Sequence, residues 1–274
     1  MTQPPEDYAR SVDLIPAGSA TTMVAEQPQS AAVYRDRPVV VTGAAGLVGT
    51  QVCRELTAAG WKVRAIVRDS EKAAARLGDF PLEIRTGDIR DAESMRSALA
   101  GGSALVHLAA IAFEKSSESY ADVNTDATAV LMDAAKRGGV ERVVYMSQNG
   151  ADSASPYDFL RSKGRAQDIV TNSTAKWTVL RPSVIFGPDD EFVNVLGRMV
   201  RLSPFVFPLP GGGTARFQPI AVGDVALVVR KALSDNATIG HSYAIGGSTP
   251  LTLRQMTERI LVAMNTRRKL VGMP

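Results

Sequence analysis

The 274-residue sequence predicts a doubly wound parallel α/β sheet with a smaller lobe at its C-terminal end. Two observations predict this fold. From Pro38 onward, short β-branched runs alternate about six times with segments of helical periodicity. After Gly187 this alternation weakens, and Pro and Gly become frequent. Alternating strands and helices are typical of a parallel sheet with helices on both faces, because right-handed crossovers join parallel strands.

The individual elements follow from local patterns. Strands are expected where apolar runs end at glycine or at polar residues, and helices where apolar residues recur every three or four positions. The expected strands of the sheet are residues 38–43, 62–68, 82–88, 104–110, 141–147 and 177–187. The expected helices between them are residues 47–60, 71–78, 92–101, 126–139 and 159–172. In the lobe we expect helices at 191–202, 225–233 and 251–264 and a strand at 240–247.

Composition excludes several classes of protein. Lys and Arg number 31 against 28 Asp and Glu, and a net charge of +3 predicts no nucleic-acid partner. No apolar run is long enough to predict a membrane span. One cysteine and two histidines predict neither a disulfide nor a metal site, and the lone thiol fits a reducing compartment, so we expect a cytoplasmic protein.

The first strand leads into a glycine-rich turn, Thr-Gly-Ala-Ala-Gly-Leu-Val-Gly, before the first helix. A helix N-terminus offers free N–H groups and partial positive charge to phosphates. Gly43 is expected to make the turn, Gly46 to admit the phosphates, and Gly49 to let the helix pack on the strand. The pattern at this junction predicts a Rossmann-like dinucleotide site. Its candidate residues here are Gly43, Ala45, Gly46, Leu47, Val48 and Gly49.

The next strand ends predict contacts to the adenosine half of the cofactor. Arg68 follows the second strand, where an arginine accommodates a 2′-phosphate, so NADP(H) is favoured over NAD(H). Alternatively, Asp69 caps the next helix or contacts the ribose, and Arg68 is solvated. Asp88 is expected to accept from the adenine amino group, or else to cap a helix, and Ile89 to pack on the ring. The small residues that end the fourth strand permit close approach of the cofactor; they are Leu108, Ala109 and Ala110.

Several blocks in this order resemble landmarks of one family. They are TGAAGLVG, GDIRD, LVHLAA, VNTDATAVLMDAA, RPSVIFGP and PIAVGDVA. Together they make the chain, from about Pro38 onward, similar to the short-chain dehydrogenase/reductase superfamily in its extended or atypical branch. The segments SPYDFLRSKGRAQ, RPSVIFGPDDEF and GGGTARFQPIAVGDVA look closest to the subgroup that contains the nucleotide-binding accessory subunit of respiratory complex I.

The resemblance implies a Tyr-x-x-x-Lys pair on a helix, in which lysine holds the ribose and lowers the pKa of the tyrosine. Here the lysine is Lys163, but Phe159 stands four residues earlier and has no ionisable proton. Tyr157 remains an alternative proton donor, since it is spaced four residues from Arg161. The other residues implied in the site are Asn124 and Ser147. At the end of the sixth strand, Arg181 and Pro182 are expected at the carboxyl edge, where open sheets bind ligands, and Ser183–Gly187 are expected to border the nicotinamide.

These residues leave two functions open. One is an NADP(H)-dependent oxidoreductase or epimerase that acts on a small-molecule substrate and takes its proton from Ser147, Tyr157 or water. The other is a non-redox NADP(H)-binding structural or sensor protein, which the phenylalanine at position 159 favours. The expected domains are a flexible N-terminal tail over residues 1–37, a Rossmann domain over 38–187, and a substrate lobe over 188–274 that is interleaved with the last sheet elements and possibly cut short. A homodimer, or a partner that docks the tail, is expected.

Overall fold

The computed structural model describes Tyr34 and residues 36–274, and most of the expected tail, residues 1–37, lies outside them. Its centre is a seven-stranded sheet in which all neighbouring strands are parallel. Across the sheet the strands are β11 (His241–Ile245), β6 (Lys176–Pro182), β5 (Arg142–Met146), β4 (Ala104–His107), β1 (Val39–Thr42), β2 (Val63–Val67) and β3 (Glu83–Thr86). The chain therefore winds outward in both directions from β1 and β4. The predicted doubly wound sheet is confirmed.

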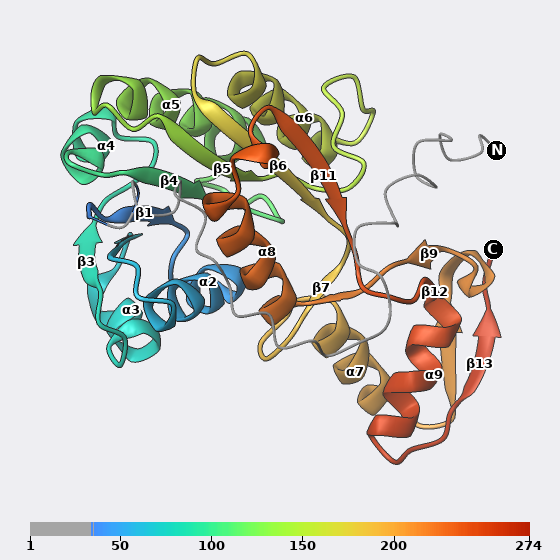
Figure 1. Cartoon of the computed structure of the whole chain (residues 1–274). Helices are drawn as coiled ribbons and strands as arrows, with labels where there is room; N and C mark the ends of the chain where they lie inside the picture. The colour runs from blue at the N-terminus through green and yellow to red at the C-terminus, as the bar shows by residue number, and fades with distance from the viewer. Residues whose placement is uncertain (1–33, 35) are drawn as a thin grey trace.

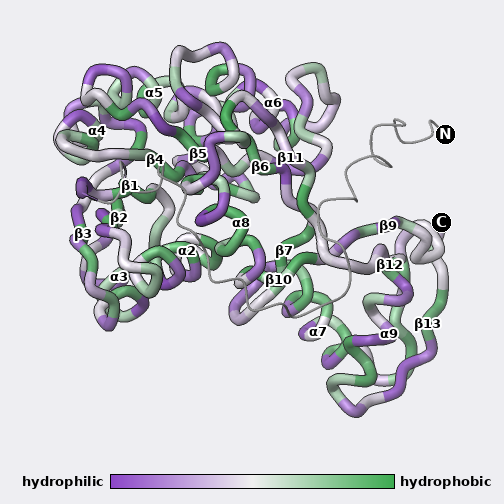
Figure 2. Tube along the Cα trace, viewed as in Figure 1, coloured by the Kyte–Doolittle hydropathy of each residue, from purple (hydrophilic) through white to green (hydrophobic). Residues whose placement is uncertain are grey.

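Helices cover both faces of this sheet. On one face lie α2 (Leu47–Ala58), α3 (Ser70–Leu77) and α8 (Val222–Ser234), and on the other lie α4 (Ala92–Leu99), α5 (Ala127–Arg137) and α6 (Asp158–Thr171) (Figure 1). Val39 and Val41 of β1 pack into the first layer and Val40 into the second. Figure 2 shows hydrophobic residues concentrated along the central strands β1 and β4. Between Tyr34 and the C-terminus, no helix combines the length and apolar character that a membrane crossing requires.

The remaining elements form a small lobe beside the sheet (Figure 1). Its strands pair two by two: β7 (Ile185–Phe186) with β10 (Ile220–Ala221), β9 (Arg216–Phe217) with β12 (Leu251–Thr252), and β8 (Val206–Leu209) with β13 (Lys269–Gly272). Its helices are α7 (Val193–Leu202) and α9 (Leu253–Ala263), with a 3₁₀ turn, η3 (Pro210–Gly213). A second 3₁₀ turn, η4 (Asn236–Thr238), connects α8 to β11 of the main sheet. Phe207 and Leu209 form the core of the lobe with Val200 and Leu261. Most of these strands were not expected, because segments of two to four residues are too short to show a period.

Three elements matter for the site: one was not expected, and two come from the segment that was expected to interleave with the sheet. The helix expected to begin at 126 is preceded by a π-helical turn, η2 (Ala121–Asp126), which runs directly into α5. α8 and β11 come late in the chain but belong to the main sheet and its helical layer. Single π turns inside helices are rare and occur frequently at functional sites.

Candidate dinucleotide-binding site

The turn between β1 and α2 is closely packed against the end of β4. Gly43 has a φ of +69°, and a Cβ there would lie 2.8 Å from the backbone nitrogen of Ala109. Gly49 lies inside α2, where a Cβ would come within 2.1 Å of the carbonyl oxygen of Gly43. Gly46 is the N-cap residue of α2 and donates its N–H to that same carbonyl oxygen at 3.0 Å. The turn therefore holds the start of α2 against the carboxyl edge of the sheet.

The N-terminus of α2 has a free, electropositive end. No side chain among the described residues caps it, and its first turn carries no acidic residue. A helix begun in this way leaves backbone N–H groups and partial positive charge for an external anion. Gly46, which lines a cavity in front of the turn, has no side chain, so the backbone at this end of the helix can approach a ligand closely. These features fit the diphosphate of a dinucleotide.

A cavity of about 420 Å³ opens in front of this turn, at the point where the strand order reverses. Open α/β sheets bind their ligands at this position. The predicted residues that line it are Gly43, Ala45, Gly46, Arg68, Asp88, Ile89, Leu108, Ala109 and Ala110. The lining also contains charged or apolar residues that the sequence reasoning missed: Lys72, Arg76, Arg90, Ile111 and Glu118. The spacing of Arg76 on an amphipathic helix gave no signal, because charged residues on exposed helix faces are common.

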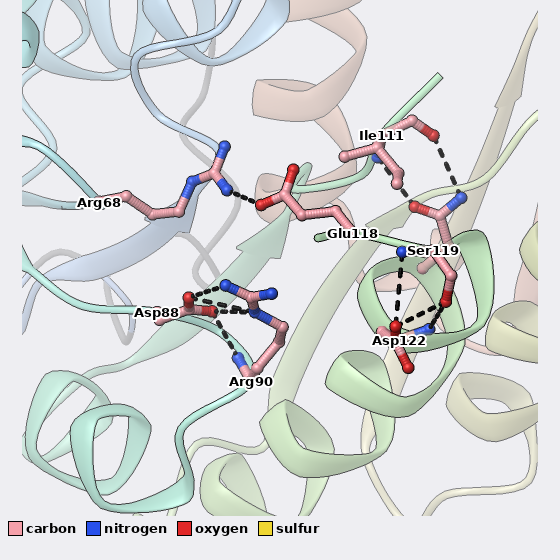
Figure 3. Close-up of polar contacts among 8 residues, drawn as sticks. Arg68, Asp88, Arg90, Ile111, Glu118, Ser119 and Asp122 are labelled. Atoms are coloured by element: carbon pink, nitrogen blue, oxygen red, sulfur yellow. Dashed lines mark hydrogen bonds and ion pairs between the residues drawn. The ribbon is translucent and has the colours of Figure 1, made fainter. Parts of the chain in front are cut away.

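Four charged residues that line the cavity form two ion pairs, Arg68 with Glu118 and Arg90 with Asp88 (Figure 3). Arg68 forms an ion pair with Glu118, from the segment between β4 and η2. Asp88 accepts hydrogen bonds from the Nη2 of Arg90 at 2.6 Å and from its backbone N–H at 2.9 Å. These hydrogen bonds from Arg90 hold the pKa of Asp88 below its usual range. The cavity edge therefore carries both cations and ionised carboxylates.

Two alternatives raised from the sequence are decided by the helix caps. Asp69 is the N-cap of α3 and accepts the backbone N–H of Lys72 at 3.0 Å, so the capping interpretation of Asp69 is confirmed. The helix after β3 is capped by Asp91, whose side chain accepts from Glu93 and Ser94. The alternative in which Asp88 caps that helix is therefore wrong, since Asp88 lies too early in the chain and pairs with Arg90.

Lys163 lies deep beside β5. Its side chain is buried, and its Nζ donates to the carbonyl oxygen of Met146 at 2.7 Å. The ammonium also stands 4.7 Å from the centre of the Tyr145 ring. Burial without a carboxylate partner lowers the pKa of Lys163 to about 7. This amine can therefore exist in either protonation state near neutral pH.

The amine of Lys163 forms no hydrogen bond with the other predicted catalytic residues, Ser147 and Tyr157. Ser147 is buried and donates its hydroxyl to the Oε1 of Gln167 at 2.9 Å. Tyr157 precedes α6 and is 70% exposed. Phe159 packs edge-on against Tyr120, with ring centres 5.6 Å apart. Neither Tyr157 nor Phe159 therefore supplies a phenol to the lysine, and the tyrosine ring beside its amine is that of Tyr145.

The expected nicotinamide side lies at the end of β6. The Nε of Arg181 is buried and has no hydrogen-bond partner within the described residues. The carbonyl oxygen of Pro182 accepts from Asn149 at 3.0 Å, and the hydroxyl of Ser183 accepts from the backbone of Gln218 at 3.1 Å. Like Leu47, Val48, Gly49, Asn124, Ser147 and Lys163, these residues lie outside the lining of the 420 Å³ cavity. The cavity therefore brings together residues expected at the adenosine and diphosphate, and none of those expected at the nicotinamide.

Asn124 joins the segment after β4 to α6. Its Oδ1 accepts the backbone N–H of Ile111 at 2.9 Å, and its Nδ2 donates to the carbonyl oxygen of Ile111 at 3.2 Å. The same Nδ2 donates to the hydroxyl of Ser162 at 3.1 Å. Asn124 is itself buried on the π turn η2. It therefore fixes the backbone of a cavity-lining residue, Ile111.

The family of the chain is established by comparison with known proteins. Residues 43–236 match the family described as NAD(P)H-binding. The chain belongs to this family. The match begins at the glycine turn and runs past α8, so it contains the strands and helices that form the cavity. The resemblance expected from the sequence is thus confirmed at the level of an NAD(P)H-binding family.

Two relatives illustrate the range of the family. The chain is 31% identical over 227 residues to NADH dehydrogenase (ubiquinone) 1 alpha subcomplex subunit 9, mitochondrial, of Arabidopsis thaliana, covering 80% of this chain and 56% of that protein. It is 32% identical over 235 residues to sterol demethylase protein B of Methylococcus capsulatus, covering 76% of this chain and 69% of that protein. This chain therefore spans little more than half the length of the Arabidopsis relative.

Solved structures confirm the fold. A dTDP-glucose 4,6-dehydratase from Streptomyces venezuelae, solved with NAD and TYD bound, aligns with a TM-score of 0.74 at 22% identity. The alignment covers 86% of this chain and 85% of that one. At this identity the likeness establishes a shared architecture.

Proposed function

We propose that this chain binds a pyridine dinucleotide at the 420 Å³ cavity and prefers NADP(H) to NAD(H). The observation that carries the proposal is the uncapped N-terminus of α2 behind the Gly43 turn. Backbone N–H groups of residue 45 and residues 47–49 would hold the diphosphate, and Asp88 and Ile89 would contact the adenine. Arg68 would bind the 2′-phosphate, because a guanidinium forms paired hydrogen bonds with phosphate oxygens.

We propose further that binding, without redox turnover, is the principal role. Phe159 supports this role, because a phenyl ring in place of the expected tyrosine cannot give or take a proton. The exposure of Tyr157 adds support, since its side chain is largely in solvent whereas the side chain of Lys163 is buried. The Arabidopsis relative, named as a subunit of NADH dehydrogenase, is consistent with a structural or sensor role beside a partner.

One observation favours the second candidate, an NADP(H)-dependent oxidoreductase or epimerase acting on a small molecule. Lys163 is buried with its pKa lowered to about 7, as suits a group that exchanges protons near neutral pH. Bound nicotinamide would supply hydride transfer, and Lys163 or Ser147 would hold the proton. NADPH consumption with a panel of carbonyl compounds and nucleotide sugars distinguishes the two roles: turnover supports the second and its absence, with binding intact, the first.

The binding proposal is tested by Gly46→Asp. The backbone at Gly46 has φ −77° and ψ 175°, which any residue adopts, and a Cβ would meet only the Gly43 carbonyl oxygen, at 3.2 Å. Asp is a favourable N-cap, so the variant is expected to fold. Its carboxylate would occupy and repel the diphosphate position, and we expect the calorimetric Kd for NADPH to rise at least about 100-fold.

Gly46→Asn is the matched control. It caps the helix equally well without charge, and we expect a smaller loss of about tenfold. Wild-type protein should also gain about 2.7 kcal/mol of unfolding free energy at an NADPH concentration of 100 Kd. Unchanged NADPH affinity in Gly46→Asp would contradict the proposed diphosphate position.

A further inference from the structure

One ion pair at the cavity joins two segments far apart in the sequence. Arg68 follows β2, and Glu118 lies 50 residues later, before η2. The side chain of Arg68 is 61% exposed, whereas that of Glu118 is only 10% exposed. Figure 3 shows the two side chains pointing toward each other across the edge of the cavity. The arginine proposed to bind the 2′-phosphate thus already has a buried anionic partner.

The segment that carries Glu118 is held in place on both sides. The backbone groups of Lys115 and Glu118 bond reciprocally, at 3.0 and 3.1 Å. Directly after Glu118, the hydroxyl of Ser119 donates to Asp122 at 2.7 Å, and the backbone of Tyr120 donates to Glu114 at 2.7 Å. The carboxylate of Glu118 is therefore positioned by the local backbone and does not depend on Arg68 alone.

The other carboxylates of the cavity have partners close by in the sequence. Asp69 pairs with Lys72 on the helix that it caps, at 3.1 Å. Asp88 pairs with Arg90 two residues later. Glu118 differs because its partner, Arg68, belongs to another element and would be needed by the ligand. A 2′-phosphate at Arg68 would meet the Glu118 carboxylate at close range.

We propose that Glu118 determines the discrimination between NADP(H) and NAD(H) by competing with the ribose 2′-phosphate for Arg68. This inference rests on the proposed dinucleotide binding. A phosphate can bind the guanidinium only if it displaces the Glu118 carboxylate or shares the guanidinium with it. Sharing is unfavourable, because the two anions repel each other. NAD(H) has a 2′-hydroxyl and leaves the ion pair intact. Glu118 therefore weakens NADP(H) binding selectively.

The test is Glu118→Gln, which keeps the shape of the side chain and removes its charge. Calorimetric titration at low ionic strength should show the Kd for NADPH falling about tenfold, with the Kd for NADH changing less than about twofold. Arg68→Gln should weaken NADPH binding by about tenfold or more and leave NADH binding nearly unchanged. In the Arg68→Gln background, adding Glu118→Gln should recover at most about twofold, because competition requires the guanidinium.

The matched control is Glu141→Gln, the same substitution at another carboxylate. Glu141 precedes β5, at the amino end of that strand and away from the carboxyl ends that border the cavity, and it pairs with Lys176 at 2.9 Å. We expect it to bind both nucleotides as wild type does. An unchanged NADPH-to-NADH ratio in Glu118→Gln overturns the inference while leaving the proposed binding intact. If Glu118→Gln increases NADPH affinity as much in the Arg68→Gln background as in the wild type, competition for Arg68 is ruled out, and the proposed binding is again left intact. Failure of wild type to bind either nucleotide overturns the proposed function and this inference together.

Discussion

The glycines at residues 43, 46 and 49 meet different steric constraints. Gly43 requires a positive φ and has no room for a Cβ beside Ala109. Gly49 has no room for a Cβ because the Gly43 carbonyl lies against it, so it lets α2 approach the turn that follows β1. Gly46 lines the cavity, and a Cβ there would need only a small shift of the Gly43 carbonyl oxygen, 3.2 Å away. The first two glycines maintain the turn, and the third keeps space open for a ligand.

Lys163 should make stability depend on pH. Its pKa is lowered to about 7 in the folded protein by burial, whereas the unfolded value is 10.5. Above pH 7 the unfolded chain binds more protons, so stability rises with pH. From pH 7 to 8.5 we expect the free energy of unfolding to increase by roughly 1.5 kcal/mol, measured by urea denaturation. Beyond this window, the unfolded thiol of Cys53 ionises, and its pKa in the fold is raised to about 12.

The control for this prediction is Lys163→Met, which retains the apolar stem of the side chain without the amine. In this variant the increase between pH 7 and 8.5 should disappear, because the group that titrates is gone. If wild type and variant show parallel pH profiles, the amine is not desolvated as the structure indicates.

At the scale of elements, the segment from β4 to α5 forms one side of the cavity. Its residues come from a strand end, an irregular stretch and the π turn η2. The sequence predicted β4 and the helix but not the π turn, because a local widening of a helix leaves no periodic signal. The side chain of Asn124, on that turn, forms hydrogen bonds with both backbone groups of Ile111 and so ties the irregular stretch to η2.

Asn124→Ala should therefore loosen this segment. Removing the amide leaves the N–H of Ile111 without that partner, and we expect a loss of about 2 kcal/mol in the free energy of unfolding. Because Ile111 lines the cavity, the Kd for NADPH should also rise several-fold. Asn172→Ala, at the C-terminus of α6, is the control and should change stability by less than about 0.5 kcal/mol. Equal effects of the two variants would argue against the role of Asn124.

Over the whole molecule, the main sheet and the small lobe have separate cores. The lobe core contains Val200, Phe207, Leu209 and Leu261, whereas the sheet packs two much larger clusters on its faces. Both tryptophans of the chain, Trp61 and Trp177, pack with the main-sheet clusters. Tryptophan fluorescence therefore reports on the main sheet, and circular dichroism on both parts.

Leu209→Ala should destabilise the lobe selectively. Its side chain is fully buried, and the cavity left behind should cost about 2–5 kcal/mol. We expect the circular dichroism transition in urea to begin before the fluorescence transition, with the Kd for NADPH within about twofold of wild type, because the nucleotide cavity lies on the sheet. The control, Leu105→Ala in β4, removes an equally buried leucine and should shift both transitions together. Coincident transitions in Leu209→Ala would show that the two cores unfold as one.

The amino-acid sequence by itself determined the strand and helix order, the glycine turn and the position of Arg68, because periodicity and turn chemistry are local properties. The tertiary structure decided which distant residues meet. It paired Arg68 with Glu118, 50 residues apart, and buried the amine of Lys163 beside Tyr145. Such contacts depend on how loops cross the carboxyl edge of the sheet, and on which side chains the resulting packing withdraws from water. No local pattern encodes either, so the charge balance around the proposed 2′-phosphate position became visible only in the folded chain.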